Sequence, residues 1–264
     1  MIVDLIEAGC KKIEVTSFVN PKVVPQMADA EQLIAALPKN DVIYSALILS
    51  NSGLTRALKT TITNYNIVMA VSDGFNLKNA RRTAQQSMEE LGQVVKMSKQ
   101  STKYVNVTLG TAFGCPYDGE IPLHHVLSTI EHFLVVGADE ITLADTTGLA
   151  NPLQVEKVVK EVFNQFGREL KLGLHFHNTR GLGMANALAG LQNGVTRFDS
   201  SIAGTGGCPF APKAAGNICT DDLVFMLHEM GHTTNIDLTK IVNISKWLEH
   251  VLERKLDGMY MKTV

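Results

Sequence analysis

Short runs rich in β-branched and aromatic residues alternate along the chain with longer segments whose apolar residues recur about every 3.6 positions. This alternation is typical of a parallel sheet whose strands are connected by helices. Several of the short runs are almost continuously apolar, as expected for strands that are covered on both faces. The pattern predicts strands at residues 11–18, 42–49, 65–71, 104–112, 140–146, 170–178 and 197–204.

The segments between these strands have the apolar period of amphipathic helices. Pro122 and Pro152 stand where the first turn of a helix tolerates proline, and glycines before several strands indicate helix ends. A last amphipathic segment, 237–256, predicts an extra helix outside the repeat, and no linker divides the chain, so 1–264 is expected to be a single domain. The other helices are predicted at 27–37, 80–100, 122–136, 152–166, 182–193 and 220–230.

The beginning of the chain does not fit a complete repeat. Met1 leads directly into a predicted helix that ends at Gly9, before the first predicted strand. A closed barrel of alternating strands and helices has eight strands and each repeat begins with a strand. We therefore expect a (β/α)8 barrel, the TIM-barrel fold, whose first strand is missing and would precede Met1. An open seven-stranded sheet is the alternative.

Composition and charge exclude several classes of function. The chain is 45% hydrophobic and 19% charged with a net charge of −2, and no cluster of Lys and Arg predicts binding to nucleic acid or to a membrane surface. No apolar run approaches the ~18 residues of a membrane span. Asp4 and Glu7 stand where a secretory signal would be basic or apolar, and the four cysteines form no CxxC pair. We expect a cytoplasmic protein, or a mitochondrial-matrix protein in a eukaryote.

Two histidines in the segment LHFHNTRG, residues 174–181, give the strongest chemical signal. Alternate side chains of a strand face the same side, so His175 and His177 are expected to project together while Phe176 faces away. Two imidazoles at the carboxyl end of a barrel strand can chelate one metal ion, and active sites of this fold lie at that end. A pair of structural histidines is the alternative. Arg180, on the following loop, is suited to an anionic substrate.

The glycine-rich segment after the last predicted strand, residues 203–217, is the second signal. Its glycines permit close approach of the backbone to a ligand. Cys208 lies among glycines and prolines rather than in an apolar periodic segment, which favours an acid–base role over the packing role of an average free cysteine. Asn217 either caps the next helix or offers an amide oxygen to a metal.

Carboxylates near strand ends give a third signal. By alternation Glu14, Thr16 and Phe18 are expected to share one face, and a carboxylate inside a barrel needs a partner, either a structural cation or a substrate. Asp145 is a second carboxylate at a strand end. The Gly-Cys-Pro turn at 114–119 places Tyr117 near the same rim.

Together these segments resemble the 3-hydroxy-3-methylglutaryl-CoA lyases, members of a metal-dependent barrel family that includes isopropylmalate and citramalate synthases. The motifs IEVTSFVNPKVVPQMAD, TAFGCPYDG, DEITLADTTG, HFHNTRG and GTGGCPFAPKAAGN carry the resemblance in order and spacing, over about residues 1–258. The GGCP segment is the specific part, because the synthases share the HxH pattern and lack this cysteine loop.

The resemblance implies a set of site residues and a cofactor. A divalent ion, Mg²⁺ or Mn²⁺, would be held by His175, His177 and Asn217, although two nitrogen ligands would also suit Zn²⁺. The implied catalytic residues are Cys208, which handles a proton of the acetyl fragment, with Glu14, His175 and Asp145, and the implied substrate-binding residues are Arg180, Tyr117 and Ser72. A homodimer is implied by the resemblance alone.

The implied reaction is cleavage of 3-hydroxy-3-methylglutaryl-CoA to acetyl-CoA and acetoacetate. The chain departs from the family at two places: the first strand, which carries an Arg-Asp pair in the family, is absent, and Asn178 stands where related lyases have aspartate after the HxH pattern. Losing such electrostatic groups typically costs ~10²–10³ in rate. An inactive truncated protein that binds metal or acyl-CoA, and an aldol-type acyl-CoA synthase, are therefore alternatives to a lyase.

Overall fold

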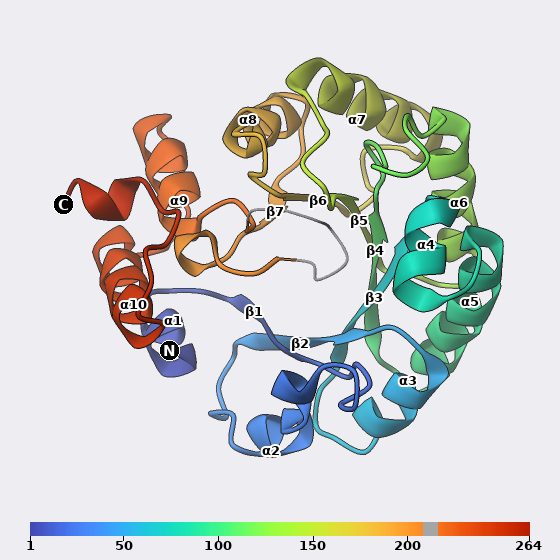
Figure 1. The fold of residues 1–264 in the computed structure, drawn as a ribbon, viewed down its shortest axis with the longest axis horizontal. Helices are drawn as coiled ribbons and strands as arrows, with labels where there is room; N and C mark the ends of the chain where they lie inside the picture. The colour runs from blue at the N-terminus through green and yellow to red at the C-terminus, as the bar shows by residue number, and fades with distance from the viewer. Residues whose placement is uncertain (208–215) are drawn as a thin grey trace.

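The strands form one parallel sheet that curls around a central space. The computed structural model describes residues 1–207 and 216–264. The strands are hydrogen-bonded in sequence order, and Figure 1 shows β1 and β7 at the two edges of the curled sheet. The strands are β1 (Lys12–Ser17), β2 (Ile43–Ile48), β3 (Asn64–Ala70), β4 (Tyr104–Gly110), β5 (Glu140–Asp145), β6 (Leu172–Phe176) and β7 (Arg197–Asp199).

Helices lie around the outside of this sheet (Figure 1). None of the helices that the structure describes has the length and apolar character that crossing a bilayer requires. The α-helices are α1 (Ile2–Glu7), α2 (Ala30–Ala35), α3 (Asn51–Ala57), α4 (Asp73–Ala80), α5 (Ala84–Gln100), α6 (Leu123–Val135), α7 (Pro152–Phe166), α8 (Gly183–Gln192), α9 (Thr220–Glu229) and α10 (Leu238–Val251). Short 3₁₀ turns are η1 (Pro25–Met27), η2 (Ile202–Gly204) and η3 (Tyr260–Lys262).

All seven predicted strands are present in the described part of the chain, and each neighbouring pair is parallel. The observed architecture is thus an α/β fold with a curled seven-stranded sheet. A closed eight-stranded barrel with an absent first strand remains a prediction. The same holds for the description of α10 as an addition to the repeat, and for the single-domain assignment.

The predicted helices differ from the observed ones at particular places. The pattern missed α3 and α4, and it began α5 at residue 80 instead of Ala84. Arg81, with φ 58°, ends α4, and Thr83 then starts α5 through a reciprocal capping box with Gln86. The segment predicted as one helix at 27–37 is divided into η1 and α2, and α10 ends at Val251 rather than at residue 256.

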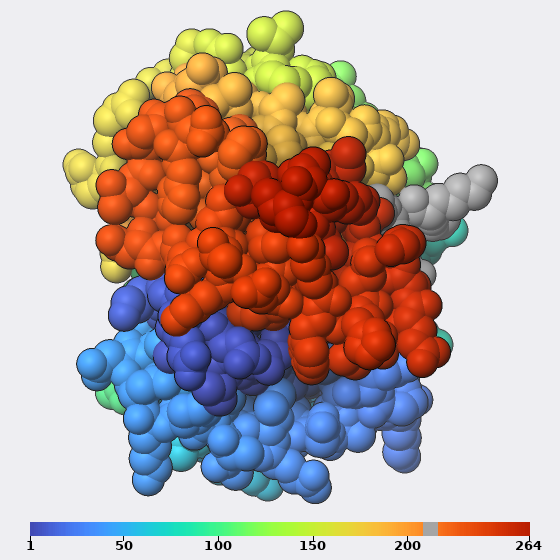
Figure 2. Space-filling view, turned by 90° about the vertical axis from the view of Figure 1, so that its left-hand side faces the viewer, coloured from blue at the N-terminus to red at the C-terminus, as the bar shows by residue number. Residues whose placement is uncertain are grey.

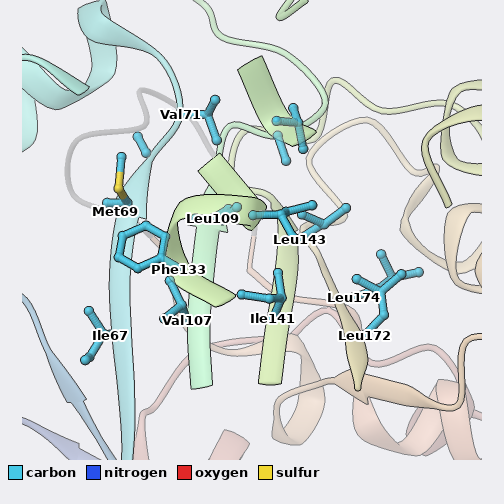
Figure 3. Packing of buried hydrophobic residues seen from close by; sticks show 14 of the residues in the cluster. Ile67, Met69, Val71, Val107, Leu109, Phe133, Ile141, Leu143, Leu172 and Leu174 are labelled. Atoms are coloured by element: carbon cyan, nitrogen blue, oxygen red, sulfur yellow. The ribbon is translucent and has the colours of Figure 1, made fainter. Parts of the chain in front are cut away.

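The core lies between the strands and the surrounding helices. Along β3, Tyr65, Ile67 and Met69 are buried on the helix side, and Asn64 and Asn66 alternate with them and face the central space. Figure 3 shows the same helix-facing layer continuing through the next strands. Its members include Val107, Leu109, Ile141, Leu143, Leu172, Leu174 and Phe133, all nearly or fully buried. This apolar layer leaves polar side chains on the inner side of the sheet.

Helices α1, α9 and α10 cover the side of the molecule between β7 and β1. Figure 1 places them next to one another beside both chain ends, and Figure 2 shows the N-terminal residues in contact with the C-terminal ones on this face. A second cluster of buried residues joins these helices, and it includes Leu5 of α1 with Ile241 and Ile244 of α10. The backbone N–H of Asp237 also donates to the carbonyl of Ala8, 2.8 Å away.

Candidate metal centre and active site

Two imidazoles converge at the carboxyl end of β6. His175 and His177 both line the central cavity, while Phe176 between them is fully buried against Phe113 on the helix side. This is the arrangement that strand alternation predicts. The Nε2 atoms of the two histidines are 3.3 Å apart. An ion about 2.0–2.1 Å from each nitrogen, the usual metal–imidazole distance, fits between atoms separated in this way.

Asp199 orients the first of these histidines. It ends β7, where the register of the sheet pairs it with His175, and its Oδ2 is 3.3 Å from Nδ1 of His175. A carboxylate that accepts a hydrogen bond from Nδ1–H leaves the lone pair of Nε2 for a metal. Burial acts to lower the pKa of His175, but the hydrogen bond and charge of Asp199, together with the charge of Glu14, outweigh it and raise the pKa above its ordinary value. The negative surroundings favour a cation.

Asn217 lies beside the second histidine in the structure. Its backbone forms an isolated antiparallel bridge with His177, and its side chain lines the cavity. Nδ2 of Asn217 donates to the carbonyl of Thr205 at 3.2 Å, which fixes the orientation of the amide. Among the described residues, no donor reaches Oδ1 of Asn217, although this atom is buried. A buried acceptor without a donor is costly unless another group, such as a cation, satisfies it.

This donor set fits a divalent metal ion. Imidazole nitrogen together with amide oxygen is a set that Mn²⁺, Mg²⁺ and Zn²⁺ accept. Residues 1–207 and 216–264 contain no group of three His, Cys, Asp or Glu side chains arranged for a metal. The proposed set has two such residues and an amide, so the site would have room for ligands from water or substrate.

Glu14 supplies a carboxyl group beside the histidines. It lines the cavity from β1 and accepts a hydrogen bond of 2.7 Å from Nδ2 of Asn66 on β3. Desolvation by the surrounding protein raises the pKa of Glu14 to about 7. The hydrogen bond from Asn66 and the charge of His175 act in the opposite direction. The carboxyl group is therefore able to take up or release a proton near neutral pH.

The predicted alternation along β1 is wrong beyond Glu14. The pairing of β1 with β2 shifts register between Glu14 and Thr16. Such an irregularity re-aims the residues that follow it. As a result Glu14 lines the cavity, whereas Phe18 is buried in the apolar core. The three residues do not share one face.

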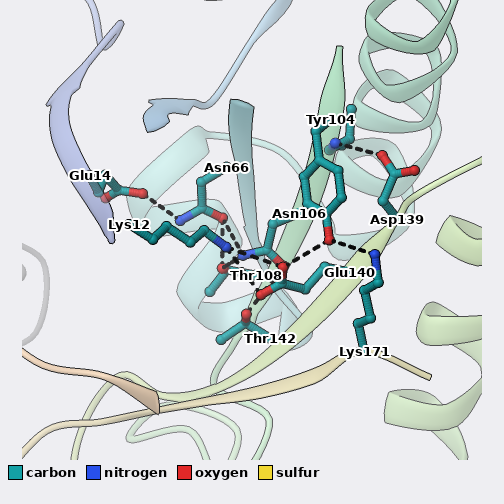
Figure 4. Close-up of polar contacts among 11 residues, drawn as sticks. Lys12, Glu14, Asn66, Tyr104, Asn106, Thr108, Asp139, Glu140, Thr142 and Lys171 are labelled. Carbon is teal, nitrogen blue, oxygen red and sulfur yellow. Dashed lines mark hydrogen bonds and ion pairs between the residues drawn. The ribbon is translucent and has the colours of Figure 1, made fainter. Parts of the chain in front are cut away.

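The cavity runs along the inner side of the sheet and has a volume of about 1340 Å³. At one end it reaches His175, His177 and Asn217, and at the other it reaches Lys12 and Tyr104. Figure 4 shows the polar side chains of the strands linked across it. Near its far end, Nζ of Lys12 lies 3.1 Å from Oε2 of Glu140, which also accepts from the hydroxyl of Tyr104 at 3.1 Å. In ordinary barrels the corresponding layers are apolar.

Asp145 and Ser72 lie away from the cavity lining. Asp145 is fully buried and accepts hydrogen bonds from the backbone N–H groups of Leu149 and Ala150, at 2.8 and 3.0 Å. Burial raises the pKa of Asp145, and these amides act in the opposite direction. The hydroxyl of Ser72 is buried beside that of Thr111, 2.9 Å away. Asp145 thus serves the backbone of its own loop and Ser72 contacts a neighbouring hydroxyl, and the contacts of both with a substrate remain predictions.

The two other predicted substrate-binding residues lie on loops. Nη1 of Arg180 donates to the carbonyls of Thr147 and Gly148, at 2.9 and 3.1 Å, and so connects the loops after β5 and β6. Tyr117 is 36% exposed, and Nζ of Lys78 lies 4.2 Å from the centre of its ring. Neither residue lines the cavity, so their substrate contacts also remain predictions.

Cys208 lies outside the described residues, and its role remains a prediction. The residues on both sides of that gap, Gly207 and Asn217, line the cavity. Asn178, where the sequence departs from related lyases, accepts the backbone N–H of Gly183 at 3.1 Å and so supports the start of α8.

Two cavity residues were missed by the sequence analysis. Asp199 could have been noticed as a carboxylate at the end of a predicted strand, but its contact with His175 depends on the register between β6 and β7. Asn66 stands near the start of a predicted strand, and an asparagine there gives no signal for a partner on β1.

Comparisons with known proteins agree with this geometry. The HMGL-like family matches residues 1–248. The chain is 38% identical to the (R)-citramalyl-CoA lyase of Chloroflexus aurantiacus, over 99% of this chain and 86% of that protein. It is 37% identical to a hydroxymethylglutaryl-CoA lyase of Bacillus subtilis, over 96% of this chain and 84% of that protein.

Solved structures of HMG-CoA lyases are also similar to this chain. An HMG-CoA lyase of Acinetobacter baumannii, in complex with coenzyme A and 3-methylmalate, superposes with a TM-score of 0.93 at 41% identity, over 99% of this chain and 86% of that one. The HMG-CoA lyase of Bacillus subtilis superposes with a TM-score of 0.94 at 35% identity, over 99% and 88%. With the family match across most of the chain, these similarities show that the chain belongs to the HMGL-like family.

Proposed function

We propose that this protein is a metal-dependent carbon–carbon lyase that cleaves 3-hydroxy-3-methylglutaryl-CoA to acetyl-CoA and acetoacetate. The observation that carries the proposal is that His175 Nε2 and His177 Nε2 lie 3.3 Å apart in a cavity that Asn217 also lines, and that no donor among the described residues reaches the buried Oδ1 of Asn217. Relatives named as acyl-CoA lyases, and a related HMG-CoA lyase in complex with coenzyme A, support an acyl-CoA substrate.

The chemistry requires loss of the proton from the C3 hydroxyl, cleavage of the C2–C3 bond and protonation of the acetyl fragment at C2. A bound Mg²⁺ or Mn²⁺ would lower the pKa of the hydroxyl and stabilise the negative charge on its oxygen. In the proposal His175, His177 and Asn217 hold the ion, and Asp199 keeps Nδ1 of His175 protonated. Glu14 accepts the proton of the substrate hydroxyl, and Cys208 delivers a proton to C2. The substrate loses one proton and gains one, so the products leave with no net change in protons.

The decisive experiment is an assay for acetoacetate after incubation with 3-hydroxy-3-methylglutaryl-CoA and Mg²⁺ or Mn²⁺. We expect product from the wild-type protein and none above background from His177→Ala. Equal product formation in the two proteins would contradict the metal-dependent mechanism. No product from either would contradict the proposed lyase activity and favour a protein that at most binds metal or acyl-CoA.

A second substrate is favoured by one comparison. The relative with 38% identity is named as an (R)-citramalyl-CoA lyase. Cleavage of that thioester next to its hydroxyl-bearing carbon releases acetyl-CoA and a 2-oxo acid, pyruvate, by the same bond-breaking step. Measuring kcat/KM for both thioesters in one preparation decides between them, because a difference in this ratio reflects differential binding of the two transition states.

The remaining features of the proposal concern the assembly and the fold. We propose that an additional strand with an Arg-Asp pair would complete a closed barrel by pairing between β7 and β1. The homodimer is an expectation from the family resemblance, and the cytoplasmic location is an expectation from the sequence. Synthesis in the condensation direction is the less favoured reaction, because the GGCP segment is a lyase feature in the resemblance.

A further inference from the structure

The carboxyl group of Glu14 is held by a neutral donor from across the cavity. In the described part of the chain, the hydrogen bond that Glu14 accepts comes from Nδ2 of Asn66, at 2.7 Å, and the two residues come from β1 and β3. Their separation of 52 positions in the sequence shows that the sheet, not a local turn, brings them together. Figure 4 shows the Asn66 amide pointing at the carboxyl group.

The orientation of the Asn66 amide is fixed by its other neighbours. Oδ1 of Asn66 accepts from the hydroxyl of Thr108 at 2.8 Å and from Nδ2 of Asn106 at 3.2 Å. The Oδ1 of Asn106 in turn accepts from the hydroxyl of Thr142 at 3.2 Å. The amide oxygens of Asn66 and Asn106 both accept from donors within this chain, so the NH₂ group of Asn66 is the end that remains for Glu14.

Burial makes this chain of groups costly to misalign. Asn106, Thr108 and Thr142 are all less than 8% exposed. A flipped Asn66 amide would face the Glu14 carboxylate with an oxygen and leave the Thr108 hydroxyl without its acceptor. The layer therefore has one favourable arrangement, and in that arrangement a donor points at the carboxyl group beside the metal-binding histidines.

We propose that Asn66 is a positioning residue, which Thr108 and Asn106 hold in place so that it fixes the Glu14 carboxyl group toward the His175 end of the cavity. This inference rests on the proposed function. It adds to it a residue on β3 that touches neither the metal nor the reacting atoms. The chemical step then depends on a layer of neutral amides and hydroxyls below the metal site.

The first test compares Asn66→Ala with Asn64→Ala. Asn64 lies two positions earlier on the same strand and the same face, and its amide donates to Thr63 instead. We expect kcat of Asn66→Ala to fall about 10- to 100-fold, the equivalent of one hydrogen bond to a charged group. KM and the Kd for Mn²⁺ should stay within about twofold, and Asn64→Ala should resemble wild type. An unchanged kcat in Asn66→Ala, or an equal fall in both variants, would overturn the proposal.

The second test uses Thr108→Val, which keeps the shape of the side chain and removes the hydroxyl. We expect a smaller fall in kcat, because the amide of Asn66 loses one restraint. In the Asn66→Ala background the same substitution should have no further effect, as pairs that act through one contact are non-additive. Full additivity would mean that Thr108 acts by another route, and the proposed chain would be wrong. Asn66→Gln, which retains an amide, should recover part of kcat.

A third measurement does not depend on activity. The side-chain amide signal of Asn66 in a ¹⁵N spectrum, assigned by its loss in Asn66→Ala, should shift in Glu14→Gln and stay unchanged in Glu120→Gln, a substitution at an exposed loop position. If the wild-type protein makes no product, the proposed function fails, and the Asn66 amide signal alone tests the contact between Asn66 and Glu14. An Asn66 amide signal that does not shift in Glu14→Gln would overturn the positioning role even in an active enzyme.

Discussion

Asp199 illustrates how a residue outside the proposed set of metal ligands would act on the centre. Its carboxylate holds Nδ1 of His175, so that Nε2 faces Nε2 of His177 at 3.3 Å. Without this carboxylate the imidazole of His175 can adopt the other tautomer, in which Nε2 carries a proton and cannot bind a metal.

We therefore expect Asp199→Asn to weaken Mn²⁺ binding about 10- to 100-fold, the usual effect of losing such an orienting partner. Isothermal titration calorimetry measures the change directly. Asp41→Asn, at an exposed position between α2 and β2, is the matched control for loss of one negative charge. Wild-type affinity in Asp199→Asn would rule out the orienting role.

The prediction for Cys208 differs from that for Asp199, because the proposed role of the cysteine is proton transfer and not metal binding. We expect Cys208→Ala to keep wild-type affinity for Mn²⁺ and to lose at least about 10²-fold in kcat, the lower range for a general acid or base. Calorimetry and the acetoacetate assay on the same preparation separate the two effects. Turnover equal to wild type would refute the role of the cysteine.

At the scale of the elements, the strands could be predicted and several helices could not. Strands such as β3 have near-continuous apolar runs, because their helix-facing residues Tyr65, Ile67 and Met69 are buried. Helix α4 gives no such signal, since its buried residues are Phe75 and the polar Asn76. A tertiary contact stabilises it: Nδ2 of Asn76 donates to the carbonyl of Ser72, and its Oδ1 accepts from Ser87 of α5.

The same difference applies to the site. Alternation along one strand was sufficient to place His175 and His177 together, because that relation is local. The partners Asp199 and Asn66 come from other strands, and a sequence pattern does not contain the register between strands. Asp145 accepts hydrogen bonds from the amides of its own loop, a local contact that alternation does not describe, and its role at the site remains a prediction.

Gly9, between α1 and β1, tests how these elements pack against the C-terminal segment. It has φ 96°, and a β-carbon there would lie 2.2 Å from the backbone carbonyl oxygen of Asn235. We expect Gly9→Ala to lower the free energy of unfolding by about 2–4 kcal/mol, through both strain and overlap. Gly231→Ala, with φ 80° and open space around its β-carbon, should cost about 1 kcal/mol from strain alone. Urea denaturation measures both, and equal losses would contradict the predicted overlap.

At the scale of the whole molecule, the proposed metal centre would connect distant parts of the chain. His175 lies on β6, His177 directly follows that strand, and Asn217 ends the glycine-rich segment, so one ion would bind both regions. A ligand that binds only the folded state stabilises it by mass action. We expect Mn²⁺ at about 100 times its Kd to raise Tm by about 5–10 °C. The metal should leave Tm of His177→Ala unchanged, and an equal rise in both proteins would indicate binding elsewhere.

The ligands of the ion can be observed directly by pulsed electron paramagnetic resonance of the Mn²⁺-bound protein. Two imidazole nitrogens at one ion should give ¹⁴N couplings from two nitrogens in wild type, and from one at most in His177→Ala. A wild-type spectrum without directly bound ¹⁴N would show that Mn²⁺ is held away from His175 and His177. That result would contradict the central claim, that these two histidines form a metal-dependent active site.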